Sequence, residues 1–201
     1  MVPSLKTRRS LLGSITVTAL AILPFTRAAS AALTENGKTW GLSKRPHFDR
    51  VLAAWAIKRF IDTQAHFMFA AKIEDLAPNV MPVGFPTGEL SAFEPAGGTC
   101  FHKAVVKYQL DDPALLALDR MDSQAIVWNR TMLQGGTWTG RTLPVDMEDR
   151  YARWSFGLLG LADAFQRKAR SDQECLDLGF PIFDALYDLV AFELKAKGVK
   201  T

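Results

Sequence analysis

Three arginines, Arg45, Arg50 and Arg59, lie on or just before one predicted helix. A guanidinium group is planar and always charged, and its forked donors suit a tetrahedral oxyanion such as sulfate. The amino-terminal end of the helix, near Phe48, adds a partial positive potential that also favours anions. We therefore predict a binding site for a small oxyanion at these arginines, with Trp55 of the same helix as a fourth ligand-binding residue.

A structural role for the same arginines competes with ligand binding. Asp49, Asp62 and neighbouring acids follow the arginines closely in sequence, and ion pairs with them would form an ordinary solvated helix face. Trp55 equally fits the core of a helical domain. The sequence leaves both interpretations open.

Metal-binding side chains are present but scattered along the chain. None of them has the close spacing of a common metal motif, so a site would have to assemble through the fold; they are His47, His66, His102, Glu89, Glu94 and Asp49. We predict Glu94 and His102 as the metal ligands, although Glu94 also fits an exposed loop position beside Pro95. The cofactor is therefore unknown from the sequence, and a metal ion is compatible with it.

The two cysteines, Cys100 and Cys175, are far apart in sequence. A disulfide requires that folding bring them close, and a free cysteine commonly packs as a small buried apolar residue. His102 follows Cys100 by two residues, so on a helix the side chains point in different directions and form no immediate nucleophilic pair. The chain also lacks haem-attachment, P-loop, dinucleotide-binding and Gly-x-Ser-x-Gly motifs, which leaves enzymatic activity an open question.

Residues 1–31 have the form of a cleavable export signal. A twin-arginine pattern, "TRRSLL", precedes an apolar stretch over residues 11–25 and a small-residue exit at Ala29-Ser30-Ala31. The stretch is shorter than the roughly 20 apolar residues of a typical membrane span, so an anchor and an uncleaved core helix are the weaker alternatives. We predict cleavage after Ala31 and a periplasmic protein, exported by the twin-arginine route, with no stable membrane anchor.

The charge balance changes when residues 1–31 are set aside. They hold 4 of the 24 basic residues and none of the 21 acidic ones, so 20 basic and 21 acidic residues remain. The remaining chain has no basic run, and nucleic acid is therefore not an expected partner.

The positions of the candidate residues depend on a mainly helical framework. Apolar spacing predicts an amphipathic helix over 48–61, a short strand over 65–70, two short helices from Cys100 and from Pro113, and long helices over 146–169 and 172–197. Asp111 or Asp112 would cap the helix at Pro113, and Pro181 would bend or restart the last helix.

These elements predict an α+β fold that is mainly α-helical, a single compact domain with a short strand after the first helix. We assign residues 1–31 to the signal peptide, 32–45 to a flexible lead-in with two glycines, and 46–198 to the domain. Trp138 lies in a glycine-rich stretch, "QGGTWTGRTLP", where it would face a pocket mouth or a partner protein.

Six stretches, which together span most of residues 45–192, have a familiar pattern: "RPHFDRVLAAWAIKRFID", "HFMFA", "TCFHKAV", "LDDPAL", "FGLLGLA" and "FDALYDL". In these stretches the chain resembles the C-terminal domain of bacterial chromate-resistance proteins of the ChrB type, including exported versions. The resemblance implies the family's fold and a function connected with chromate, a tetrahedral dianion like sulfate.

The chain departs from the family pattern at several positions. Ala53-Ala54 stand where family members usually carry Cys-Pro, Glu94 stands at a usual histidine position, and Thr99-Cys100 replace Cys-Thr. The histidine and aspartate set that often follows the middle helix is not evident in "DRMDSQAIVWNRT". If those family residues bind metal or carry redox chemistry, this chain has lost or rebuilt the site.

The export signal and the resemblance together imply a periplasmic protein that binds or responds to chromate, another oxyanion or metal stress. The alternatives are a metal-dependent redox enzyme and a non-catalytic domain that binds another periplasmic protein. The expected partners are a small oxyanion or metal ion, together with such a protein.

Overall fold

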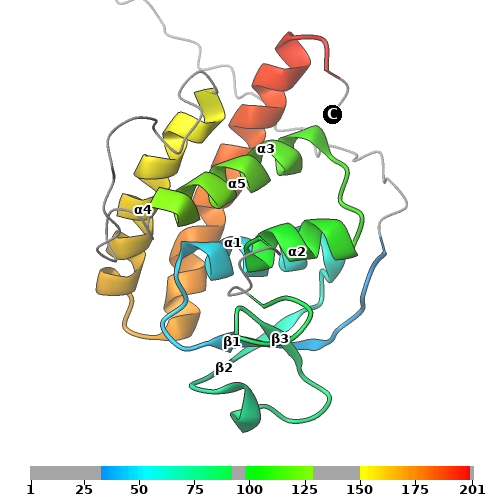
Figure 1. Cartoon of the computed structure of the whole chain (residues 1–201), viewed down its shortest axis with the longest axis vertical. Coiled ribbons are helices and arrows are strands. Elements are labelled where there is room, and N and C mark those ends of the chain that lie inside the picture. Colours follow the sequence, from blue (N-terminus) through cyan, green and yellow to red (C-terminus); the bar gives the residue numbers. More distant parts are fainter. Residues whose placement is uncertain (1–32, 92–97, 129–149, 200–201) are drawn as a thin grey trace, which may run out of the picture.

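The computed structural model describes residues 33–91, 98–128 and 150–199 (Figure 1). It confirms a mainly helical α+β domain with a short strand after the first helix. In chain order the elements are β1 (Thr39–Ser43), α1 (Phe48–Ala56), the π-helical turn η1 (Ile57–Ile61), β2 (His66–Ala70), the 3-10 turn η2 (Ile73–Asp75), β3 (Met81–Val83), α2 (Cys100–Lys107), α3 (Pro113–Trp128), α4 (Arg150–Lys168) and α5 (Asp172–Ala196).

The three strands form a small parallel sheet in the order β2-β1-β3. The chain passes from β1 through α1 to β2, because parallel neighbours need a crossover connection and a helix supplies it. Figure 1 shows the sheet at one end of the domain, with α1 and α2 over it and α3 beyond them. The core therefore lies between the sheet and the helices.

The predicted flexible lead-in over residues 32–45 is wrong for Thr39–Ser43, which form the central strand. Trp40 and Leu42 are completely buried. A Cβ at Gly41 would lie 2.6 Å from the Leu76 side chain, so the glycine permits close packing on this face. The sequence suggested a linker because the strand is short and contains glycine, whereas its burial comes from neighbours later in the chain.

Asp62, which follows the first helix, holds the segment from Gly37 to Trp40 in place through hydrogen bonds. Its carboxylate accepts hydrogen bonds from the backbone N–H groups of Gly37 and Lys38, both at 2.8 Å, and from Trp40 Nε1 at 3.1 Å. The Gln64 N–H also donates to it at 3.1 Å. Asp62 thus has a structural role at the start of the domain.

The predicted helix over 48–61 is present, but it changes character after Ala56. Residues Ile57–Ile61 form a π-helical turn in which the Asp62 N–H donates to the Ile57 carbonyl over 2.7 Å. Trp55 is buried, and its ring packs against Phe183 and Tyr187 of α5. The fit of Trp55 to the core is confirmed.

α5 continues through Pro181 for 25 residues, so the predicted restart is absent. Its packing against α1 compensates for the hydrogen bond that proline cannot donate. The two helices lie close together at Gly179, where a Cβ would lie 2.5 Å from Val51 Cγ1. Asp112, rather than Asp111, caps α3, because its Oδ1 accepts from the N–H groups of Ala114 and Leu115.

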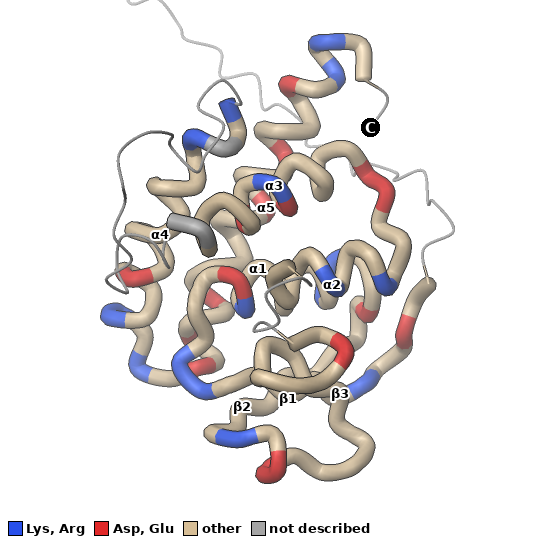
Figure 2. The backbone as a smooth tube through the Cα atoms, in the orientation of Figure 1, with Lys and Arg blue, Asp and Glu red and all other residues tan. Residues whose placement is uncertain are grey.

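Acidic and basic positions are scattered over all parts of the domain, as the coloured backbone of Figure 2 shows. None of the helices in the described ranges is long and apolar enough to cross a membrane. The segment around Trp138 lies outside the described residues.

Candidate functional site

The structure does not gather the three predicted arginines at one place. Arg50 Nε donates to the Gly84 carbonyl at 3.1 Å, and its Nη1 lies 3.3 Å from Asp49 Oδ1. This ion pair is one of those expected from the competing structural interpretation. Arg50 therefore ties α1 to the loop after β3.

Arg59 has a carboxylate partner that the sequence could not reveal. Its Nε and Nη2 donate to the two carboxylate oxygens of Asp184 on α5, at 2.8 and 2.7 Å, and Trp55 Nε1 donates to the same carboxylate at 2.8 Å. Arg59 holds the pKa of Asp184 below its usual value, although partial burial opposes the shift. Trp55 and Arg59 thus share one acidic partner in a contact between α1 and α5.

Arg45 is held through its backbone instead. Its N–H donates to Asp172 Oδ1 at 2.8 Å, and its carbonyl accepts from Gln166 Nε2 at 3.0 Å. The backbone has a φ of 52°, in the left-handed region that is uncommon for a residue other than glycine. The Arg45 guanidinium has no partner within the described part of the chain, and the residue is exposed.

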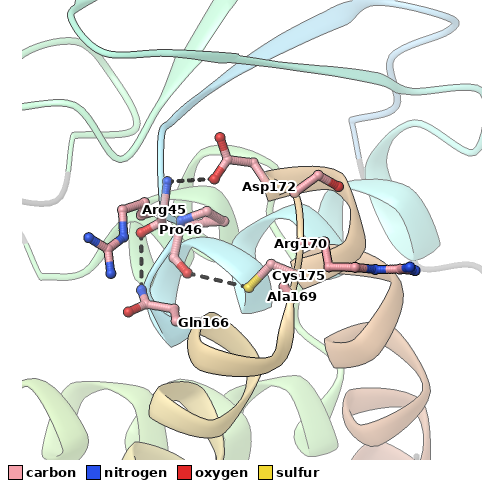
Figure 3. Close-up of a pocket in the computed structure, with 8 residues that line it drawn as sticks. Arg45, Pro46, Gln166, Ala169, Arg170, Asp172 and Cys175 are labelled. Atoms are coloured by element: carbon pink, nitrogen blue, oxygen red, sulfur yellow. Dashed lines mark hydrogen bonds between the residues drawn. The ribbon is translucent and has the colours of Figure 1, made fainter.

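A polar pocket of about 260 Å³ lies where Arg45 and Pro46 meet the turn between α4 and α5 (Figure 3). Two arginines and one carboxylate are among its lining residues, which are Arg45, Pro46, Gln166, Ala169, Arg170, Ser171, Asp172 and Cys175. In Figure 3 the side chains of Arg45 and Arg170 extend toward opposite sides. Arg170 is mostly exposed and is paired with Glu174, with Nη2 to Oε1 at 3.0 Å.

Cys175 forms the buried side of this pocket. Only 2% of the residue is exposed, and its Sγ lies 3.8 Å from the Pro46 carbonyl oxygen. Burial, reinforced by the charge of Asp172, raises the pKa of the thiol to about 11. The group is therefore a neutral thiol at neutral pH.

A second polar cluster is buried beneath α1, at the start of α2. Cys100 Sγ lies 3.6 Å from Asp49 Oδ2, and the Thr99 hydroxyl donates to Asp122 Oδ2 of α3. Asp122 is completely buried, and its Oδ1 has no partner among the residues that the structure describes. The two carboxylates therefore share a buried region with one thiol.

The charges in this cluster are unequal. Burial alone would raise the pKa of Asp49, but the hydrogen bond from His47 and the charge of Arg50 hold it below its usual value. Burial, and then the negative charge of Asp49, raise the pKa of Asp122 well above normal. Burial and Asp49 likewise raise the pKa of Cys100, which stays a thiol.

His102, a predicted metal ligand, forms a pair with Asp119. Its Nδ1 lies 2.8 Å from Asp119 Oδ2, an arrangement common for metal-binding histidines, whose other nitrogen holds the metal. Across residues 33–91, 98–128 and 150–199, no group of three His, Cys, Asp or Glu side chains could hold a metal ion. Glu94, the other predicted ligand, lies outside the described residues.

Sequence reasoning missed Gln166, Arg170, Asp119 and Asp122. The last two lie three residues apart in "DRMD", which places them on one face of a helix and was a usable signal. Gln166 and Arg170 carried no such signal, because they line the pocket only where α4 and α5 pack against the start of α1. The cysteines are both free and buried, so no disulfide joins them.

Comparison with protein families gives one match. Residues 40–134 match the family described as ChrB, C-terminal domain. Comparisons with curated proteins and with solved structures returned no match. The matched range begins within β1 and continues beyond the end of α3.

Proposed function

Residues 40–134 belong to the ChrB C-terminal domain family, and from this premise we propose that the chain is an exported protein that binds chromate or a similar small oxyanion at the Arg45 pocket. The family indicates a function related to chromate resistance. Export by the twin-arginine route and action in the periplasm are parts of the proposal, supported by the form of residues 1–31.

The availability of the Arg45 guanidinium is the observation that carries the anion-binding proposal. Arg50 and Arg59 support it less, because each donates to a carboxylate. Arg45 has no such partner in the described structure, and it borders a pocket large enough for a tetrahedral dianion. Asp172 and Gln166 already fix its backbone through hydrogen bonds. Little backbone conformational entropy is therefore lost when Arg45 binds an anion.

The remainder of the pocket has both favourable and opposing charges. The first turn of the 25-residue helix α5 forms one wall and contributes a partial positive potential. Asp172 and Glu174 in that turn offset it, and Glu174 largely neutralises Arg170. We therefore expect the site to bind an anion with modest affinity, and most of that affinity should depend on Arg45.

Isothermal titration of the full chain with chromate and with sulfate tests the proposal. Both anions are expected to bind, and Arg45→Gln should weaken each by about tenfold or more, since a hydrogen bond to a charged group contributes about 1.5–3 kcal/mol. Arg153→Gln is the matched control, because Arg153 is exposed on α4 and does not line the pocket. The absence of heat for either anion with the unchanged chain would refute the proposal.

A further inference from the structure

The carboxy-terminal half of α5 presents an apolar face that nothing in the described part of the chain covers. Its apolar residues are exposed and recur at helical spacing: Ala185, Leu189, Phe192 and Ala196. Phe192 is 71% exposed and Leu189 is 45% exposed. Figure 1 shows these turns of α5 at one extremity of the described domain, where a partner can reach them. A continuous apolar face of this kind on a protein surface marks an interaction site.

Two opposite charges border the face on one flank of the helix. Asp188 lies four residues before Phe192, Lys195 lies three residues after it, and both are exposed. They are two helical turns apart, about 10 Å along the axis, which is too far for a direct ion pair within one helix. Asp188 has no partner within residues 33–91, 98–128 and 150–199. The face therefore carries an acid and a base at similar distances on either side of Phe192.

We propose that this face joins two copies of the chain, whose α5 helices pack antiparallel about a two-fold axis at Phe192. A two-fold contact is isologous, so it brings the same patch of both copies together and requires a patch that is complementary to itself. An acid on one side of the centre and a base on the other meet this requirement when the helices run in opposite directions. The charge pattern thus selects both the partner and the orientation.

The antiparallel arrangement matches each group on the face with a suitable one. Phe192 meets Phe192 of the partner subunit at the axis. On the charged flank Asp188 lies opposite the partner's Lys195, and symmetry forms this pair twice. On the other flank Leu189 lies opposite the partner's Ala196, so a large side chain meets a small one. In a parallel pair the charged flank would instead meet the partner's apolar flank.

The same charges favour a second copy over a lipid surface. A helix that lies on a membrane carries Lys and Arg beside its apolar face, and anionic headgroups repel an acid such as Asp188 at that edge. A contact made by one helix from each copy belongs to the small interfaces, below about 1,200 Å² in total, which are weak. We therefore expect a dimer that dissociates in the micromolar range.

Sedimentation velocity of the full chain over a range of concentrations measures this association. The unchanged chain should be dimeric at roughly 100 µM and dissociate as it is diluted toward about 1 µM. Phe192→Asp should weaken dimerisation at least tenfold, because it places two carboxylates together at the axis. Val106→Asp is the matched control, since Val106 is 62% exposed but lies on α2, and this variant should dimerise like the unchanged chain.

Reversal of the two charges tests the orientation. Asp188→Lys and Lys195→Asp should each weaken dimerisation, because each substitution sets like charges opposite one another on the charged flank. The double variant should recover the affinity of the unchanged chain, since both opposite-charge pairs are restored. Both residues are exposed, so the variants should keep the circular dichroism of the unchanged fold.

Three results would overturn the proposal. The first is an unchanged chain that stays monomeric at roughly 100 µM, whether or not it then binds vesicles of phosphatidylcholine and phosphatidylglycerol. The second is a dimer that Phe192→Asp leaves intact. The third is a double charge variant that associates no better than the single variants. None of these measurements depends on anion binding at Arg45.

Discussion

Replacement of Asp122 by Asn tests how the buried cluster at the start of α2 responds to pH. Asp122 is completely buried, accepts a hydrogen bond from Thr99 through Oδ2, and has no partner for Oδ1 among the described residues. Asparagine has nearly the same shape, and its carbonyl can accept from the same hydroxyl. The substitution therefore removes the ability to ionise while keeping the packing.

The sign of the effect follows from the pKa shift. Burial and the charge of Asp49 raise the pKa of Asp122 well above 3.8 in the folded protein. The folded state thus holds the proton more strongly than the unfolded chain, and the resulting stabilisation is complete below the unfolded pKa. It is lost as the pH rises, at about 1.4 kcal/mol for each pH unit, until the folded pKa is passed. Asp122→Asn lacks this loss, so its free energy of unfolding should exceed that of the unchanged protein by an amount that grows through this window.

Urea denaturation at intervals between pH 4 and pH 8 measures the difference directly. Near pH 4 the two proteins should have similar free energies of unfolding, and the advantage of Asp122→Asn should grow steadily as the pH rises toward 8. Asp163→Asn is the control, because Asp163 is exposed on α4. A variant whose free energy of unfolding runs parallel to that of the unchanged protein over the whole range would contradict the reasoning.

Two further predictions concern helix packing and export. Gly179→Ala should lower the free energy of unfolding by about 1–3 kcal/mol, because the new Cβ would lie 2.5 Å from Val51 Cγ1, a stiff and buried side chain. Gly157→Ala in α4, with nothing within 4 Å, should instead raise it by up to about 1 kcal/mol, and equal effects in urea denaturation would contradict this contrast. Replacing both Arg8 and Arg9 with Lys should retain the chain in the cytoplasm, and cell fractionation of the double variant beside the unchanged chain measures this. A double variant that still reached the periplasm would contradict export by the twin-arginine route.

The sequence predicted the helices better than the sheet because helical periodicity is local. The apolar positions from Phe48 to Ile61 indicate a helix without knowledge of its neighbours, and Asp112 before Pro113 indicates where another begins. β1 has only five residues, and its burial depends on pairing with β2 and β3, which follow more than 20 and 40 residues after its start. A short strand with Gly41 at its centre carries no comparable local signal.

The candidate site was predictable only in part, for the same reason. The choice of Arg45 as a ligand residue depended on its position before a helix and on a resemblance that includes the Arg-Pro pair. Its separation from Arg50 and Arg59 is determined by Gly84 and Asp184, which are 34 and 125 residues distant from them. Spacing rules cannot detect partners that are so distant in sequence. The three arginines, which are close in sequence, therefore lie at three separate places in the structure.

The boundary of the family match gives the pocket a particular significance. Arg45 and Pro46 lie inside the matched range of 40–134, whereas the other lining residues, from Gln166 to Cys175, follow it. The pocket lies where the start of α1, from the matched range, meets α4 and α5, and Gly179 allows α5 to lie close to Val51 of α1. A ligand at Arg45 would therefore bind both parts of the domain and stabilise their contact, since a ligand that binds only the folded state raises stability. If the proposed site is correct, the matched range supplies the positive charge of Arg45, and the helices beyond it supply most of the pocket wall.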